Sequence, residues 1–127
     1  MLIVYLSLTG NVESFVERLD MKSLKISQSN LHQEISEDFI LVTPSYNDKL
    51  TEDMSTFIEY KNNKSHLVGV VGSGNRNFDN MYCFNAKALS KKYNKPLVFT
   101  FEFRGTDEDI IDFKKEVDAI EITKATR

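Results

Sequence analysis

Four continuous apolar runs constrain the fold of this chain more than any other feature of its sequence. They cover Leu2–Leu6, Phe39–Val42, His66–Val71 and Leu97–Phe101. Each run has the length and residue types of a strand, and none shows the alternation of a sheet with one face in water. Strands that are apolar on both faces must be covered on both faces, so the runs predict a parallel sheet between layers of helices. A more polar segment, Ser23–Ile26, is expected to be an edge strand.

Amphipathic stretches between the apolar runs predict four helices. The second is expected to begin at Thr51 as its cap, with acidic residues in its first turn. The third should end before Pro96, and Thr106 is expected to cap the fourth. The expected buried faces are Val12, Phe15, Val16 and Leu19; Met54, Phe57 and Ile58; Ala86, Leu89 and Tyr93; and Ile110, Phe113, Val117 and Ile120.

The predicted order of elements is strand, helix, strand, strand, and then helix, strand, helix, strand, helix. This order indicates a doubly wound α/β fold, with a five-stranded parallel sheet and helices on both faces. Right-handed crossovers leave few topologies, and the flavodoxin-like strand order 2-1-3-4-5 suits a chain of 127 residues. We expect residues 1–127 to form a single domain.

Charge and composition exclude several classes of function. A net charge of −3 and a pI near 5.4 argue against a nucleic-acid partner. No apolar run approaches the roughly 20 residues of a membrane span. The single cysteine, Cys83, excludes an intramolecular disulfide and indicates a reducing compartment, for which the cytoplasm is the default. His32 and His66 have no metal-ligand spacing, so no metal site is expected.

Parallel sheets of this kind bind ligands outside the carboxyl ends of their strands. The loop Ser7–Asn11 follows the first strand and offers two hydroxyls, an amide and a glycine at the start of a helix. Free N–H groups at a helix N-terminus form an anion site. Because the loop has no lysine, a phosphate monoester fits better than a triphosphate. A plain capped helix start is the alternative interpretation.

Two further loops lie at the same predicted edge. Gly72–Phe78 contains two glycines and two asparagines, which suit a backbone shaped around a flat ligand. Its Phe78 could stack on a ring, as could Tyr82, or Phe78 could instead pack in the core. Thr43–Leu50 supplies Tyr46 and a turn, and a simple surface turn explains it equally well.

Three motifs resemble a known family. The first, Ser7-Leu8-Thr9-Gly10-Asn11-Val12, is similar to the S-x-T-G-N-[VT] phosphate loop of flavodoxins. The segment Gly72–Phe78, followed by Tyr82 and Cys83, resembles the G-S/A-G-N-x-N-[FW] flavin loop of NrdI proteins. Phe101–Thr106, with Asp109, is similar to the F-E-x-x-G-T-x-x-D segment of that family. The likeness runs from Met1 to about Val117, and NrdI proteins are flavodoxin-like partners of class Ib ribonucleotide reductase.

The resemblance implies a bound FMN. Its phosphate would be held by Ser7, Leu8, Thr9, Gly10, Asn11 and Val12. One side of its isoalloxazine would be lined by Thr43, Pro44, Ser45, Tyr46, Asn47 and Asp48. The other side would be lined by Ser73, Gly74, Asn75, Arg76, Asn77, Phe78, Tyr82 and Cys83.

The family's role implies redox activation. Reduced FMN reacts with dioxygen and supplies superoxide to the small reductase subunit (NrdF type), where a dimanganese-tyrosyl radical cofactor is assembled. A flavodoxin or flavin reductase would donate the electrons, and no side chain need be catalytic, because the cofactor carries the chemistry. An electron-carrying short-chain flavodoxin is the alternative, and a flavin-free α/β binding domain is a third possibility.

One departure from the family concerns the middle loop. Many members carry a glycine there beside flavin N5, and this chain has none between Thr43 and Leu50. Asn47 and Asp48 are the residues there that best tolerate positive φ. This departure bears on the reduction potentials of the flavin and leaves flavin binding itself unaffected. Cys83 is interpreted as a packing residue, with a redox thiol as the alternative.

Overall fold

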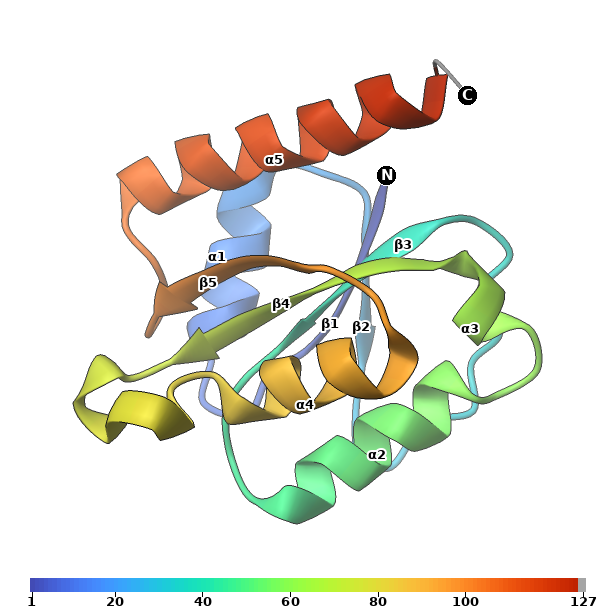
Figure 1. The fold of residues 1–127 in the computed structure, drawn as a ribbon, viewed down its shortest axis with the longest axis horizontal. Coiled ribbons are helices and arrows are strands. Elements are labelled where there is room, and N and C mark those ends of the chain that lie inside the picture. Colours follow the sequence, from blue (N-terminus) through green and yellow to red (C-terminus); the bar gives the residue numbers. More distant parts are fainter. Residues whose placement is uncertain (126–127) are drawn as a thin grey trace.

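A computed structural model describes residues 1–125, without the side chain of Asn80. Five parallel strands form one sheet in the order β2-β1-β3-β4-β5 (Figure 1). The strands are β1 (Leu2–Leu6), β2 (Ser23–Ile26), β3 (Phe39–Thr43), β4 (Leu67–Gly74) and β5 (Leu97–Glu102). The predicted strand order is therefore confirmed, as is the edge position of Ser23–Ile26.

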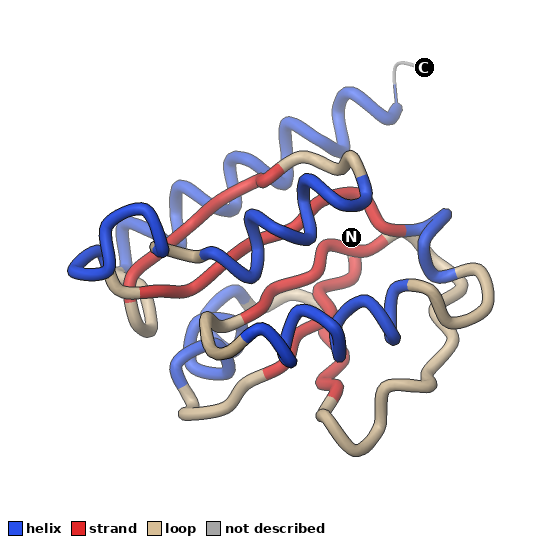
Figure 2. Tube along the Cα trace, turned by 60° about the horizontal axis from the view of Figure 1, so that its bottom comes forward, coloured by secondary structure: helices blue, strands red, loops and turns tan. Residues whose placement is uncertain are grey.

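Helices cover both faces of this sheet (Figures 1 and 2). On one face lie α1 (Asn11–Leu19) and α5 (Asp107–Ala125), and on the other lie α2 (Asp48–Ile58) and α4 (Phe84–Tyr93). Two short elements were not predicted, the helix α3 (Asn63–His66) and the 3₁₀ helix η1 (Arg76–Met81). No helix within the described residues combines the length and the apolar composition needed to cross a bilayer.

Two apolar cores explain why the central strands β1 and β3 are apolar throughout. Alternate residues of β1 point to opposite faces, so Val4 packs with α2 and α4 whereas Ile3 packs with α1 and α5. Both residues are fully buried. On the α1 side, the rings of Phe15 and Phe101 stack with their centroids 3.8 Å apart. Burial of both faces fixes the register of the strands, because a slip of one residue would exchange the two cores.

The expected start of α2 is wrong. Its cap is Asn47, whose side-chain oxygen accepts a hydrogen bond from the Leu50 N–H at 3.1 Å. The hydroxyl of Thr51 instead accepts a bond from the Asn85 amide at 2.8 Å. Asn47 and Asp48 therefore form the cap and first residue of a helix, where a turn was expected. Both residue types are good caps, and only packing against α4 decides between them.

The bounds of β4 also differ from those predicted. His66 ends α3, so the strand begins one residue later, at Leu67. At its other end, β4 continues through Ser73 and Gly74, which were expected to lie in a loop, because they pair in register with Phe101 and Glu102 of β5.

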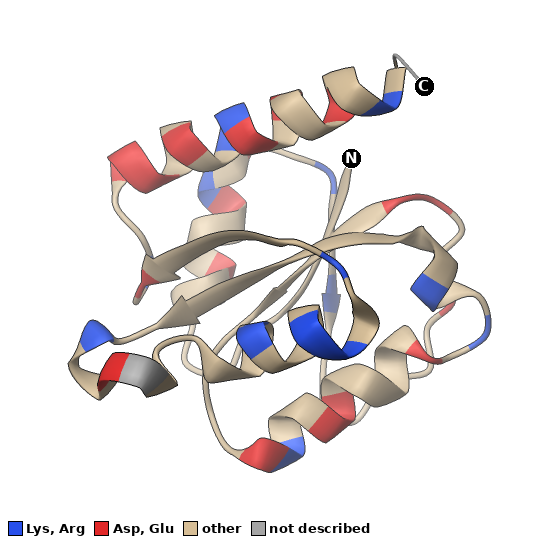
Figure 3. Ribbon diagram, viewed as in Figure 1, with Lys and Arg blue, Asp and Glu red and all other residues tan. Residues whose placement is uncertain are grey.

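The charged blocks of the sequence lie on solvated helix faces. Figure 3 shows lysines along α4 and acidic residues along α5. Lys87, Lys91 and Lys92 are all exposed. At the start of α5, the Thr106 hydroxyl accepts from the Asp109 N–H at 3.1 Å, and the Asp109 carboxylate accepts from the Thr106 N–H at 2.8 Å. The predicted cap at Thr106 is therefore confirmed as a reciprocal one.

Candidate functional site

A cavity of about 660 Å³ lies at the carboxyl ends of the strands. It is bordered by the loops after β1 and β3, the end of β4 with η1, the start of α4, and the turn after β5. In the strand order, β1 and β3 are neighbours whose connections leave in opposite directions, which is the usual ligand position in a doubly wound sheet. Its volume is in the range of small-molecule and cofactor sites.

The β1–α1 loop presents free backbone donors. Gly10 has a φ of +92°, and a Cβ placed on it would meet no atom within 4 Å. The Ser7 hydroxyl accepts from the Glu13 N–H at 3.2 Å, so this side chain caps the helix. No acceptor among the described residues reaches the N–H groups of Asn11 and Val12. Together with the open space at Gly10, these groups have the arrangement that suits an anion at a helix start.

The β3–α2 loop forms one wall of the cavity. Tyr46 is 60% exposed, and its ring has little cover from the rest of the chain. The Ser45 hydroxyl donates to the Ser73 carbonyl at 2.7 Å, which ties this loop to the end of β4. Within residues 43–50 no backbone φ is positive. The wall is thus held in ordinary conformations, with Asn47 extended at its end.

The end of β4 and η1 form the opposite wall. A Cβ on Gly74 would lie 3.0 Å from the Cys83 Sγ and 3.1 Å from the Tyr82 ring, so the close approach of these segments favours glycine. The Asn75 side chain accepts from the Asn77 N–H at 2.9 Å and caps η1. Phe78 then lies 64% exposed at the cavity, which contradicts the alternative that it packs in the core.

The turn after β5 contributes Phe103 as a third side. Phe103 has a φ of +52°, a strained value for a bulky residue, and remains 52% exposed beside the cavity. Its N–H donates to the Gly74 carbonyl at 3.0 Å. Its carbonyl accepts from the Ser73 hydroxyl at 2.5 Å. These bonds hold the strained residue. Ser45, Ser73 and Phe103 thus connect the β3–α2 loop, the end of β4 and the turn after β5.

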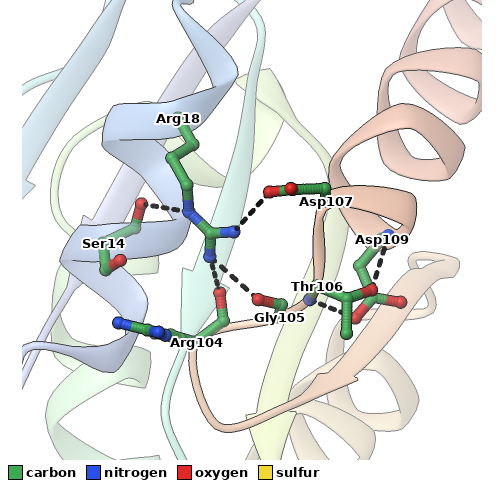
Figure 4. A network of polar contacts seen from close by, with 7 residues as sticks. All are labelled: Ser14, Arg18, Arg104, Gly105, Thr106, Asp107 and Asp109. Carbon is green, nitrogen blue, oxygen red and sulfur yellow. Dashed lines mark hydrogen bonds and ion pairs between the residues drawn. The ribbon is translucent and has the colours of Figure 1, made fainter.

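Arg18 secures the same turn from the side of α1 (Figure 4). Its guanidinium donates to the carbonyls of Arg104 and Gly105, the latter at 3.0 Å, and its Nε donates to the Ser14 carbonyl at 3.2 Å. Asp107 completes the network as an ion pair at 3.6 Å. A single side chain of α1 therefore satisfies two carbonyls of this turn.

The lysine and the arginine of the cavity loops are each paired with a carboxylate. Arg76 lies 3.2 Å from the Glu102 carboxylate, and Lys49 lies 3.0 Å from that of Asp53. Burial raises the pKa of the Cys83 thiol to about 11, so this thiol stays protonated at neutral pH. A buried, protonated thiol is a poor nucleophile, which supports the packing interpretation of Cys83.

Eleven of the residues predicted from the sequence line the cavity. They are Thr9, Asn11, Pro44, Ser45, Tyr46, Asn47, Ser73, Gly74, Asn75, Phe78 and Cys83. The other nine lie in the same segments without lining it: Ser7, Leu8, Gly10, Val12, Thr43, Asp48, Arg76, Asn77 and Tyr82. Tyr82 directly follows η1, and the Arg76 guanidinium and the Lys87 ammonium lie 5.3 Å and 5.4 Å from its ring centre.

Sequence reasoning missed Met81, Phe84 and Phe103 as lining residues. Phe103 stood within the segment that resembles the NrdI family, but nothing in the residue type indicates a positive φ. Met81 and Phe84 flank Tyr82 and Cys83, and their apolar type beside a predicted ligand loop was an available signal.

Comparisons with known proteins agree with this geometry. The sequence model of a family described as "NrdI Flavodoxin like" matches residues 3–115. A protein named "Protein NrdI" from Bartonella tribocorum is 36% identical over 120 residues, covering 91% of both chains. Proteins of the same name from Bartonella henselae and Bartonella bacilliformis are 36% and 35% identical over equal lengths.

Proposed function

The chain belongs to the NrdI flavodoxin-like family, and from this premise we propose that it binds FMN in the cavity and serves class Ib ribonucleotide reductase as a redox activator. The observation that carries the proposal is the joining of two features at one sheet edge. A helix start with free N–H groups and no cation lies beside a mainly apolar cavity with exposed aromatic rings. A flat, apolar ring system with a phosphate on its tail matches both.

The residues present fit FMN. Thr9, Asn11 and the backbone of Gly10 would hold the phosphate, because they surround the free N–H groups of the helix start. Tyr46 and Phe78 would lie against the isoalloxazine, since both rings are exposed at the cavity and aromatic pairs prefer stacked or tilted contacts.

The chain's own residues bind and orient, and none is needed as an acid, base or nucleophile. The protonated thiol of Cys83 packs against Gly74. Lys49 and Arg76 lie in the flavin loops together with Asp48 and Asp79, so these loops carry no net charge. A neutral setting does not oppose the anionic, fully reduced flavin, as an acidic surface would. When bound and reduced, FMN supplies the electron that converts dioxygen to superoxide.

Partners follow from this role. We propose that superoxide passes to the small subunit of the class Ib reductase (NrdF type) and oxidises its dimanganese site to form the tyrosyl radical. A flavodoxin or flavin reductase would reduce the FMN. The rim of the cavity suits such transient contacts, because Tyr46, Phe78, Met81 and Phe103 are all more than half exposed. In this proposal the protein acts in the cytoplasm.

Reconstitution of the radical tests the proposal. The reduced protein is mixed with dioxygen and a manganese-loaded class Ib small subunit, and electron paramagnetic resonance is used to look for the tyrosyl radical. The proposal expects a radical that requires both this protein and dioxygen, and that superoxide dismutase diminishes. Passage of electrons to acceptor proteins without radical formation would instead support the electron-carrier alternative.

A further inference from the structure

A fully buried asparagine lies behind one wall of the cavity. Asn85 is the second residue of α4, and its side chain has no exposed surface. Its amide oxygen accepts from the Tyr46 N–H at 2.7 Å. Its amide nitrogen donates to the Asn47 carbonyl at 3.0 Å and to the Thr51 hydroxyl at 2.8 Å. The amide group is therefore satisfied by the β3–α2 loop and the first turn of α2.

These hydrogen bonds hold the β3–α2 loop on both sides of the exposed Tyr46 ring. The bonded backbone groups belong to Tyr46 and Asn47, two residues that line the cavity, whereas Asn85 does not line it. Rotation of the peptide group on either side would break a hydrogen bond to a buried partner. Leaving a buried donor or acceptor unpaired costs about 1–3 kcal/mol, so the wall has one strongly favoured conformation.

Among the described residues, the other contacts of the loop do not hold the Tyr46 N–H. The loop contains no glycine, and Tyr46 is largely exposed, so apolar packing contributes little there. The Ser45 hydroxyl bonds to the Ser73 carbonyl, the Thr43 hydroxyl bonds to the Pro44 carbonyl, and the Leu50 N–H bonds to both the side chain and the carbonyl of Asn47. None of these bonds holds the Tyr46 N–H. Among the described residues, Asn85 is thus the partner of the Tyr46 N–H, and it adds a second hydrogen bond to the Asn47 carbonyl.

From this geometry we infer that Asn85 is a positioning residue for the flavin, which acts by locking the Tyr46–Asn47 wall and never touches the ligand. The inference rests on the proposed FMN binding. With the wall locked, the cavity is preorganised and the environment along the flavin edge is constant. Without the lock, FMN must order the wall when it binds, so its affinity falls and its spectral and redox properties change.

The chain offers a matched control in Asn63. This asparagine is also fully buried and also makes three bonds, accepting from the Ile35 N–H at 2.7 Å and donating to the Gln33 and Phe57 carbonyls at 2.8 Å each. It lies in α3, before β4, and so at the end of the sheet away from the cavity. Asn85 and Asn63 are therefore both buried amides with three hydrogen bonds, and only Asn85 lies beside the cavity.

The experiment compares Asn85→Leu with Asn63→Leu in the full chain. Both changes keep the number and branching of the side-chain heavy atoms and remove three hydrogen bonds, so both should lower the unfolding midpoint. Fluorescence titration should show FMN dissociation constants about tenfold higher for Asn85→Leu and unchanged for Asn63→Leu. Visible circular dichroism and the reduction potential of the bound flavin should shift only in Asn85→Leu.

If Asn85→Leu does not fold, Asn85→Ser replaces it, because the smaller side chain leaves room for water to satisfy the loop. Equal FMN affinities and unaltered flavin spectra in the folded Asn85 variant and the Asn63 variant would overturn the inference. Failure of the unmodified chain to bind FMN would instead overturn the proposed function.

Discussion

Truncation of Phe78 to alanine separates ligand binding from folding. The ring is 64% exposed at the cavity and packs against few other groups of the chain. The 3₁₀ helix that carries it is held by backbone and Asn75 bonds, which the truncation leaves in place. We therefore expect the stability of the FMN-free protein to change by less than about 0.5 kcal/mol, as for other surface substitutions.

The expected loss of affinity follows from the exposed area. An aromatic side chain offers roughly 200 Å², and a flat ligand would cover about half of the exposed 64%. At about 25 cal/mol/Å², this contact is worth about 1.5 kcal/mol. The specific gain of an aromatic pair is of the same size as the cost of immobilising the ring, so the two offset each other. The net loss of about 1–2 kcal/mol raises the FMN dissociation constant roughly 5- to 30-fold.

Fluorescence titration of Phe78→Ala with FMN measures this change, and the degree of quenching at saturation reports the loss of the stacked ring. The matched control is Ile122→Ala, because Ile122 is 65% exposed on α5 and away from the cavity. The control should keep full affinity and quenching. If Phe78→Ala binds and quenches FMN as the unmodified protein does, the reasoning that places Phe78 against the flavin is refuted.

Three further substitutions test other parts of the account. Gly10→Asp should lower the free energy of unfolding of the FMN-free protein by about 1 kcal/mol, because residue 10 has a φ of +92°. It should also abolish FMN binding in titrations, because the new side chain brings bulk and negative charge into the space for the phosphate. Retained FMN affinity would contradict the assignment of the phosphate loop. Gly105→Ala should lower stability by about 1–3 kcal/mol in urea unfolding, because φ is +75° and the new Cβ would lie 2.8 Å from the Phe15 ring; an unchanged midpoint would argue against that contact. Hydrogen bonds from Lys124 and then His66 lower the pKa of Asp38 below its usual 3.8. The ionised Asp38 therefore stabilises the folded protein above pH 3.8, and this contribution is lost as the pH falls through the lowered pKa. Asp38→Asn should therefore reduce the melting temperature at pH 7 and have little effect near pH 2; a difference that persists there would rule out the ionic cause.

The strands and their order followed from sequence because their signals are local and redundant. The runs of β1, β3 and β4 are buried on both faces, so a slip in register would uncover apolar side chains. The run of β5 lies at the edge of the sheet and is mostly half-buried. The start of α2 was missed because Asn47 and Thr51 are both capping types, and a contact with Asn85 decides between them. Gly72–Gly74 resembled a loop because pairing with β5, a long-range effect, is what makes it strand.

The sequence predicted which loops border the cavity, but it predicted less well which side chains line it. Motifs placed the loops, but the left-handed Phe103 depends on bonds from Ser73 and Gly74 in another strand. Asn85 left a signal that went unused. It precedes Leu89 and Tyr93 at intervals of four residues, so it is a polar residue on the buried stripe of α4. Such a residue needs buried partners, and here the partners shape the cavity.

The most direct test of the central claim is a comparison of FMN and riboflavin binding to the ligand-free chain. Isothermal titration calorimetry should show one FMN per chain, bound much more tightly than riboflavin, because only FMN carries the phosphate for the helix start after β1. Absence of FMN binding, or equal affinities for the two flavins, would contradict the assignment of the cavity and its phosphate loop.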